Sequence, residues 1–192
     1  MQKIINEHFQ GHLAAVTAMS EQLSAQIEVA AQLLTTTLHA GGKVLIAGNG
    51  GSAADAQHFA AELVGRFLLE RRALPALALT TDSSVLTAVG NDYGFEQVFS
   101  RQVEALASPG DLFVGISTSG NSENVCRAQE AAGHAGCSTL ALVGGEGGRL
   151  ARQGGLVLQV PANHTPYIQE GHLLLIHLLC DLVERQLFAQ ES

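Results

Sequence analysis

The amino-terminal segment follows the hydrophobic period of a helix. Between residues 2 and 40, apolar side chains recur at spacings near 3.6, and Gly11 is the only glycine or proline. This pattern predicts one long helix or two joined helices, ended by Gly41-Gly42. Such an arm could pack on its own sheet, but we favour an arrangement in which part of it packs on a partner subunit.

Short apolar runs alternate with helical segments over the rest of the chain. The runs predict buried strands at residues 44–47, 75–79, 112–116, 138–143 and 156–160. Spacing and capping residues predict one helix that begins at residue 53 and a second that follows the polar turn 80–84 and ends at 89. Further helices are predicted over 95–106, 123–132 and 149–153, and from Pro166 to about 188. Residues 90–94 should break the pattern. The buried face of the segment after this break is expected to carry Phe95, Val98, Phe99, Val103 and Leu106.

This alternation, without any hairpin signal, predicts one α/β domain with a parallel sheet, three layers deep. The arm would occupy residues 1–40 and the α/β body residues 43–192. Ligands of such sheets collect at the carboxyl ends of the strands. We therefore expect the polar turns after the first three strands to lie on one rim.

Composition and charge narrow the possible partners. Hydrophobic residues make up 46% of the 192 residues, which is typical of a globular chain. Only 15% of the residues are charged, which suggests that much of the surface is covered and favours an oligomer. The formal net charge is -8 and no basic run is present, which argues against a nucleic-acid surface. An anionic ligand would have to be held by backbone amides, hydroxyls and a few arginines.

The sequence also bears on the cellular location. The three cysteines show no paired spacing, which fits a reducing compartment rather than a disulfide framework. We find no signal-peptide core, and the longest apolar stretches are shorter than a membrane span. We therefore expect a soluble, cytoplasmic protein that does not contact a membrane.

A glycine-rich turn, Gly48-Asn49-Gly50-Gly51-Ser52, joins the first strand to its helix. Such turns point backbone N–H groups at whatever lies above them, and phosphate is the usual occupant. The turn also matches the dinucleotide fingerprint G-x-G-x-x-A. That fingerprint requires an acidic residue about 20 positions later. Asp82 lies about 30 positions later, in a Thr/Ser turn, so the match to a nicotinamide site is poor.

The segment Ser117-Thr-Ser-Gly-Asn-Ser122 is the more specific signal, because it places four hydroxyls between a strand and a helix. Hydroxyls and free N–H groups at a helix start can surround a phosphate without any lysine. These residues could instead only cap the helix. One hydroxyl would be enough for a cap, so we favour phosphate binding.

Ionisable groups line two helices. His58 and Glu62 are four residues apart, on a stripe that begins with Asp55 and ends with Arg66. They could be a base and its partner, two metal ligands, or a half-buried structural pair. On the last helix, His177 lies about 80° from Gln169, while His172 and His177 diverge by about 140°. One side can therefore present Gln169 with one histidine, and the other histidine should be structural.

Together these motifs resemble the sugar-isomerase (SIS) domain family, in particular its phosphoheptose isomerase branch. The resemblance runs nearly from end to end. It rests on the following segments: Gly48–Ser52, His58–Arg66, Gly90–Asp92, Ser117–Ser122 and Ile168–His172, with His177.

The resemblance implies a flavodoxin-like five-stranded sheet and a homotetramer with active sites near subunit boundaries. It implies an aldose–ketose isomerase that converts sedoheptulose 7-phosphate to D-glycero-D-manno-heptose 7-phosphate through an enediol, for glycans such as the lipopolysaccharide core. The catalytic base and acid would be Glu62 and His177. The substrate and phosphate contacts would be Asn49, Gly50, Gly51, Ser52, Arg66, Asn91, Asp92, Ser117, Thr118, Ser119, Ser122 and Gln169.

The resemblance further implies one zinc ion per subunit. Its ligands would be His58, Glu62, Gln169 and His177. Glu62 cannot freely abstract a proton while firmly bound to zinc. Either the metal polarises a substrate oxygen with Glu62 loosely held, or one of the two roles is absent here.

Two departures and one rival remain. Some members have Ala-Asp-Arg where this chain has Thr165-Pro166-Tyr167, and His-Cys where it has Ala53-Ala54, which puts the recognition of sugar hydroxyls in question. The rival is a non-catalytic SIS-domain tetramer that binds the bacterial replication initiator protein. That adaptor lacks an acidic residue at the position of Glu62, so its presence here favours the enzyme.

Overall fold

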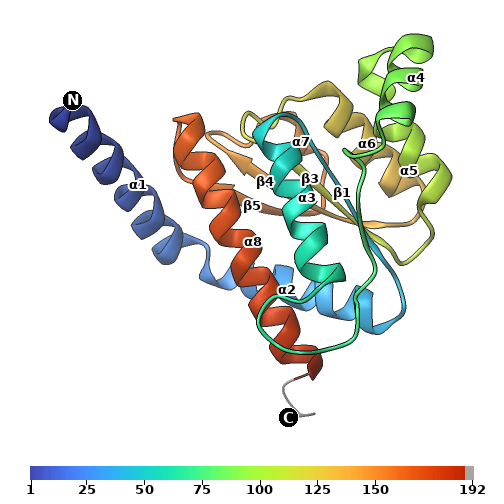
Figure 1. Cartoon of the computed structure of the whole chain (residues 1–192), viewed down its shortest axis with the longest axis horizontal. Coiled ribbons are helices and arrows are strands. Elements are labelled where there is room, and N and C mark those ends of the chain that lie inside the picture. The colour runs from blue at the N-terminus through green and yellow to red at the C-terminus, as the bar shows by residue number, and fades with distance from the viewer. Residues whose placement is uncertain (189–192) are drawn as a thin grey trace.

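The computed structural model describes residues 1–188 and shows helices on both faces of a parallel sheet (Figure 1). The strands are β1 Val44–Gly48, β2 Ala76–Ala78, β3 Leu112–Ser117, β4 Ser138–Gly144 and β5 Leu156–Val160. The helices are α1 Gln2–Gln22, α2 Ser24–His39, α3 Gly51–Val64, α4 Ser83–Tyr93, α5 Ser100–Leu106, α6 Glu123–His134, α7 Gly148–Arg152 and α8 Thr165–Phe188, with a 3-10 turn η1 Phe95–Gln97. The strand order β2-β1-β3-β4-β5 is that of the flavodoxin-like fold, as expected.

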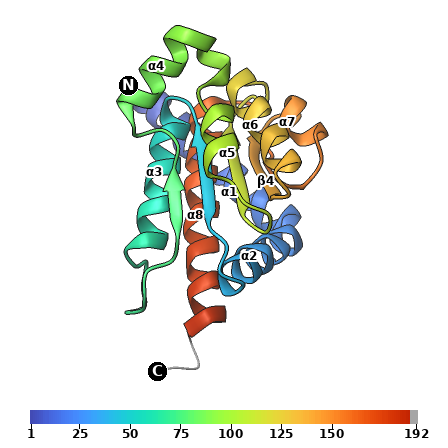
Figure 2. The ribbon, with the colours of Figure 1, turned by 90° about the vertical axis from the view of Figure 1, so that its right-hand side faces the viewer.

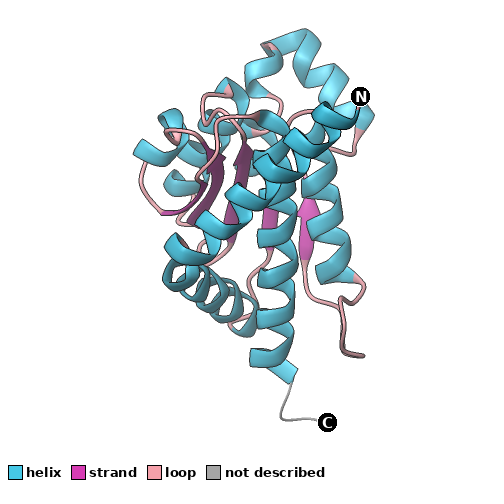
Figure 3. Cartoon of the chain, turned by 90° about the vertical axis from the view of Figure 1, so that its left-hand side faces the viewer, coloured by secondary structure: helices cyan, strands magenta, loops and turns pink. Residues whose placement is uncertain are grey.

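Alternation along each strand builds two separate cores. Val44 and Ile46 point to the core under α2, α3 and α8, while Leu45 and Ala47 point to the core under α5, α6 and α7. Figure 2 shows α3 and α8 on one side of the sheet and α5 to α7 on the other, and Figure 3 shows the helices of the first face in front of the strands. The predicted three layers are therefore confirmed.

The amino-terminal arm is two helices, which meet at Leu23. α2 packs on the first face, where Ala30, Ala31 and Leu34 are fully buried. α1 instead projects away from the sheet (Figure 1), and its first half contacts the start of α8, where His12 Nδ1 lies 2.6 Å from Glu170 Oε2 and the His8 ring lies 5.4 Å from the Tyr167 ring. Contact of this arm with a partner subunit stays a prediction.

Two local predictions were wrong. α4 continues through residues 90–93 and ends at Gly94, whose φ of 93° does break the helix. A glycine inside a helix costs only about 1 kcal/mol, and Asp82 caps the start by accepting a bond from the Val85 amide at 3.0 Å. Phe95 and Leu106 are 62% and 41% exposed, because η1 shifts the period of the segment that follows.

The order in which the chain adds strands to the sheet reverses between β1 and β3. These neighbouring strands lead to α3 on one face and α6 on the other, which opens a crevice at their carboxyl ends. None of the helices in residues 1–188 combines the length and the apolar character needed to span a bilayer.

Candidate active site

The glycine-rich turn Gly48–Ser52 and the loop Ser117–Ser122 follow β1 and β3 at this crevice, and the first turn is bonded to the helix that follows the loop. The Asn49 side chain donates to Asn124 Oδ1 at 2.8 Å, and Asn124 donates back to Asn49 Oδ1 at 2.9 Å. The expected ligand contact Asn49 is therefore held by a residue that the sequence analysis missed. Asn124 is 4% exposed in the structure. The one signal in the sequence would have been an amide side chain on the face of the helix that turns toward the sheet.

The second segment, Ser117–Ser122, is shaped by its own contacts. Ser117 Oγ and Ser122 Oγ lie 3.0 Å apart, and the amide of Asn121 donates to Ser119 Oγ at 3.2 Å. A Cβ on Gly120, whose φ is 63°, would lie 1.9 Å from the carbonyl oxygen of Gly147, so only glycine fits. The loop is thus fixed before any ligand arrives.

A hollow of about 510 Å³ opens beside this loop. Thr118 and Ser119 line it, together with Thr165 and Arg152 from elements later in the chain. Arg152 was not expected here, and its position in a short helix carries no signal of its own. Glu146 also lines the hollow and opposes an anion, but the hydroxyls and the Arg152 cation together offer the donors that an anion needs.

The first segment meets the last helix. Gly50 has a φ of 56° and α3 begins at Gly51 rather than at residue 53. A Cβ on Gly51 would lie 2.3 Å from Gln169 Nε2, so the absence of a side chain lets Gln169 reach the loop. The Ser52 side chain is buried beneath the same turn.

The reactive groups converge where α3 and α8 lie side by side (Figures 1 and 2). His58 Nε2 and His177 Nε2 are 2.9 Å apart, and Glu62 Oε1 is 3.6 Å from His58 Nε2. The ring of Phe67 stacks on His177 with centroids 5.3 Å apart. We call this group of His58, Glu62 and His177 the helix seam. Two imidazoles and a carboxylate in partial contact with solvent can exchange protons with a bound molecule.

Asp55 lies one turn before His58 on α3. Burial raises the pKa of its carboxyl to about 6, against the opposing charge of His58. Its Oδ2 atom is buried without a hydrogen-bond partner among residues 1–188. The stripe found in the sequence included Asp55, but spacing could not indicate that half of the carboxyl would be enclosed.

Other expected residues lie apart from the helix seam. Arg66 is exposed and pairs with Glu70 at 3.4 Å, while Asn91 donates to Asp92 at 2.8 Å on the surface of α4. Their contact with a ligand stays a prediction. His172 is the structural histidine: it is fully buried, and its Nε2 lies 3.1 Å from the carbonyl oxygen of Val143.

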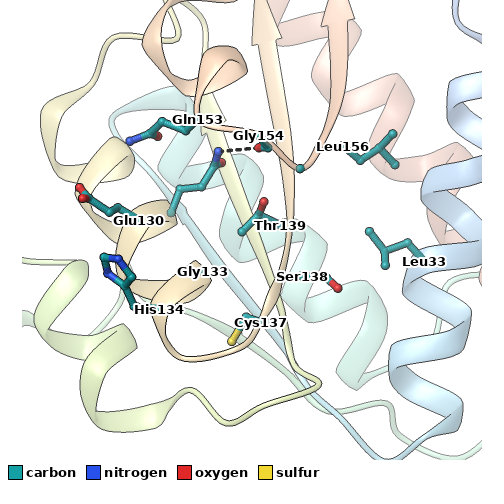
Figure 4. A pocket seen from close by; sticks show the side chains of 12 residues that line it. Leu33, Glu130, Gly133, His134, Cys137, Ser138, Thr139, Gln153, Gly154 and Leu156 are labelled. Atoms are coloured by element: carbon teal, nitrogen blue, oxygen red, sulfur yellow. Dashed lines mark hydrogen bonds between the residues drawn. The ribbon is translucent and has the colours of Figure 1, made fainter.

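A second hollow, of about 690 Å³, lies at the opposite end of the sheet (Figure 4). It is bordered by His134 at the end of α6 and by the first residues of β4 and β5, with Gln129 donating to the carbonyl of Gly154 at 3.2 Å. Helix carbonyl ends repel anions. None of the expected site residues lines it, so we place the active site at the crevice despite the size of this hollow.

Within residues 1–188, no group of three or more His, Cys, Asp or Glu side chains is arranged as a ready metal site. The helix seam nevertheless offers zinc-type donors. A tetrahedral zinc with bonds of about 2.05 Å would hold two nitrogens roughly 3.3 Å apart. The 2.9 Å between His58 and His177 is close to that separation.

Comparison with known proteins agrees with this architecture. Residues 7–144 match the model of the SIS domain, and the chain belongs to the SIS domain family. Within that family it is 58% identical to the phosphoheptose isomerase of Citrifermentans bemidjiense over 97% of both chains, and 59% identical to that of Geobacter sp. strain M21 over 96% of both.

Solved structures give the same result. The phosphoheptose isomerase of Neisseria gonorrhoeae superposes with a TM-score of 0.91 at 47% identity, over 95% of this chain and 98% of that one. The enzyme from Francisella tularensis gives a TM-score of 0.93 at 41% identity, over 96% and 98%. Fold and family predictions from the sequence are confirmed.

Proposed function

We propose that the protein is a phosphoheptose isomerase, which converts sedoheptulose 7-phosphate to D-glycero-D-manno-heptose 7-phosphate. One observation carries the proposal: where α3 and α8 meet, His58 lies 2.9 Å from His177 and 3.6 Å from Glu62. Full-length relatives of 58% and 59% identity bear the same name.

The Ser117–Ser122 loop would hold the substrate phosphate. Its hydroxyls and the start of α6 supply hydrogen bonds and a partial positive charge, and Arg152 supplies a full one. The sugar chain would then run from this loop toward Gln169 and the helix seam. This orientation uses the hydroxyl and amide donors that a chain with net charge -8 must rely on.

The chemistry needs one base and one acid. Glu62 takes the proton from carbon 1 of the ketose, the electron pair forms the carbon–carbon double bond of the enediol, and the carbonyl oxygen on carbon 2 is protonated by His177. Return of a proton to carbon 2, with loss of the hydroxyl proton on carbon 1, completes the aldose. The contact between His58 and Glu62 orients the carboxylate for this transfer.

We propose one zinc ion per subunit as the cofactor. The donors would be His58 and His177, with Gln169 and a loosely held Glu62 completing the set, so that Glu62 could still act as the base. A zinc-bound nitrogen of His177 could not also deliver a proton, and the metal would then take over the role of the acid. When bound, zinc would polarise a substrate oxygen as a Lewis acid. Metal content of the purified protein, measured by plasma mass spectrometry, tests this directly: an equimolar ratio lost in the double variant H58A/H177A is expected, and no enrichment over buffer would contradict it.

We propose a homotetramer with active sites near subunit boundaries. α1 exposes an apolar face, with Ile5 47%, Leu13 54% and Phe9 65% exposed, which an isolated chain would leave in water. A neighbouring subunit would also bring partners for Arg66 and Asp92, which lie apart from the helix seam. Light scattering of the purified protein tests the mass.

The remaining assignments concern the cellular setting. We propose that the enzyme works in the cytoplasm and that its product supplies heptose for a glycan such as the lipopolysaccharide core. The absence of a membrane-spanning helix from residues 1–188 is compatible with this location. Fractionation of cells and analysis of their glycans after deletion would test both.

The alternative, an adaptor that binds the replication initiator, is not favoured. An adaptor needs no base, whereas Glu62 is retained and lies beside two histidines. Incubation with sedoheptulose 7-phosphate, with and without zinc, separates the two functions. We expect aldose formation, and absence of turnover together with tight binding of the initiator would overturn the isomerase.

A further inference from the structure

An ion pair that belongs neither to the helix seam nor to the anion loops is buried next to the helix seam. The side chains of Arg71 and Glu184 are each 1% exposed, and Arg71 Nε donates to Glu184 Oε1 at 2.9 Å. The backbone amides of Phe67, Leu68 and Leu69 each donate to the same carboxylate at 2.8 Å. Burial alone would raise the pKa of Glu184, but these four bonds hold it below its ordinary value.

The guanidinium of Arg71 is equally occupied. It donates to the backbone carbonyls of Glu62 and Leu63 at 2.8 Å, of Arg72 at 3.0 Å and of Gly65 at 3.1 Å. The last carbonyls of a helix have no partner inside it. Arg71 therefore closes the carboxyl end of α3, and its first contact is the residue that carries the catalytic carboxylate.

The pair also reaches the other half of the site. Glu184 lies seven residues after His177, two turns further along the same face of α8. Phe67 links the two, because its amide binds Glu184 and its ring stacks on His177. In Figure 1 the segment after α3 curls around the lower part of α8, where these contacts form.

We propose that Arg71 and Glu184 are positioning residues for the isomerisation, which fix Glu62 on α3 relative to His177 on α8. The inference rests on the proposed function. A buried ion pair is weak evidence for stability, since apolar residues of the same volume often serve the fold equally well. An apolar pair could not bind four carbonyls on one side and three amides on the other. These bonds fix the orientation of α3 relative to α8 and the separation between the two helices.

The test compares Glu184→Gln and Arg71→Lys with a matched pair on the same helix. Gln keeps the shape of Glu184 without its charge, and Lys keeps the charge of Arg71 without its fork of donors. The controls are Asp181→Asn and Arg185→Lys, which alter an exposed pair of 2.8 Å. We expect kcat for sedoheptulose 7-phosphate to fall about 10–100-fold in both test variants, with KM within about threefold, and no change in the controls.

Several outcomes would overturn the inference. A folded Glu184→Gln enzyme with wild-type kcat would do so, as would a lowered melting temperature with unchanged kcat, because that result describes stabilisation alone. If Glu184→Gln fails to fold, Arg71→Lys decides the question by the same criterion.

Wild-type turnover is measured first, which separates this inference from the proposed function. If the wild type does not isomerise the sugar, the proposed function fails, and the imidazole NMR signals of His177 still report positioning. We expect them to shift in Glu184→Gln and to stay in place in Arg185→Lys. Unshifted signals in both would overturn the inference.

Discussion

The phosphate loop and the helix seam are built in opposite ways. Ser117–Ser122 is held by contacts among residues five or fewer positions apart and by contacts with α7 about 30 positions later, where the Leu150 amide donates to the Gly120 carbonyl at 2.8 Å. The seam joins His58 to His177, which are 119 positions apart and lie on two separate helices. The binding loop is therefore shaped within one short stretch of the chain and the helix α7 that packs on it, whereas the chemistry depends on how α3 and α8 are held.

The largest effect is expected from a substitution that removes the catalytic base of the helix seam. Replacing Glu62 by Gln removes the base with little change in shape, so kcat should fall about 10²–10⁴-fold while KM changes only a few-fold. Steady-state assays of aldose formation measure this. Glu130→Gln, at the opposite end of the sheet, is the control and should match the wild type. Turnover of Glu62→Gln near the wild-type rate would refute Glu62 as the base.

The second prediction breaks the loop. Gly120→Ala places a Cβ against the Gly147 carbonyl in a left-handed conformation, so the free energy of unfolding should fall on the order of 3 kcal/mol and KM should rise. Gly41→Ala is the matched control, with a φ of 87° and nothing within 4 Å of the added Cβ. It should lose only about 1–2 kcal/mol and keep its KM. If Gly120→Ala and Gly41→Ala lowered the free energy of unfolding by the same amount and both kept the wild-type KM, the loop would not be tightly packed.

The third prediction concerns the attachment of α8 to the sheet. Burial lowers the pKa of His172 to about 4, against the bond to Val143, so the unfolded chain binds a proton first as the pH falls. Stability should decrease between pH 6.5 and 4, by on the order of 3 kcal/mol from this residue. Urea denaturation at several pH values measures the slope. His172→Asn should flatten it, and an unchanged slope would contradict the assignment.

The smallest expected effect concerns the contact between the Gly48–Ser52 turn and the start of α6. Asn124→Ala leaves the Asn49 amide without its partner, at a cost of about 1–2 kcal/mol, and should raise KM a few-fold with kcat nearly unchanged. Denaturation and kinetics measure both. Asn6→Ala on the exposed face of α1 is the control. A lower kcat with an unchanged KM would mean that the Asn49–Asn124 pair supports the helix seam rather than substrate binding.

The sequence was sufficient for what depends on short-range patterns. Apolar runs placed all five strands, and hydroxyls between a strand and a helix marked the loop at Ser117. The pair His58 and Glu62 was visible because a four-residue spacing fixes one face of a helix. Its convergence with His177 followed from a family resemblance and not from spacing.

What the sequence could not predict depends on tertiary packing. The continuation of α4 through Gly90 was decided by the cap at Asp82 and by the break at Gly94 rather than by glycine content. No local pattern distinguishes Arg71 and Glu184, which form a buried ion pair 113 positions apart, from ordinary surface charges. Asn124 was hidden for the same reason.

The distance along the chain between the two halves of the helix seam also orders events during synthesis. Domains form from the amino terminus as the ribosome extends the chain. The loop and its glycine neighbours lie before the end of α7, whereas His177 lies on α8, which is made after them. It follows that a chain truncated after α7 would keep the serine loop but lack Thr165, Gln169 and His177, so we expect it to have neither the complete anion hollow nor turnover.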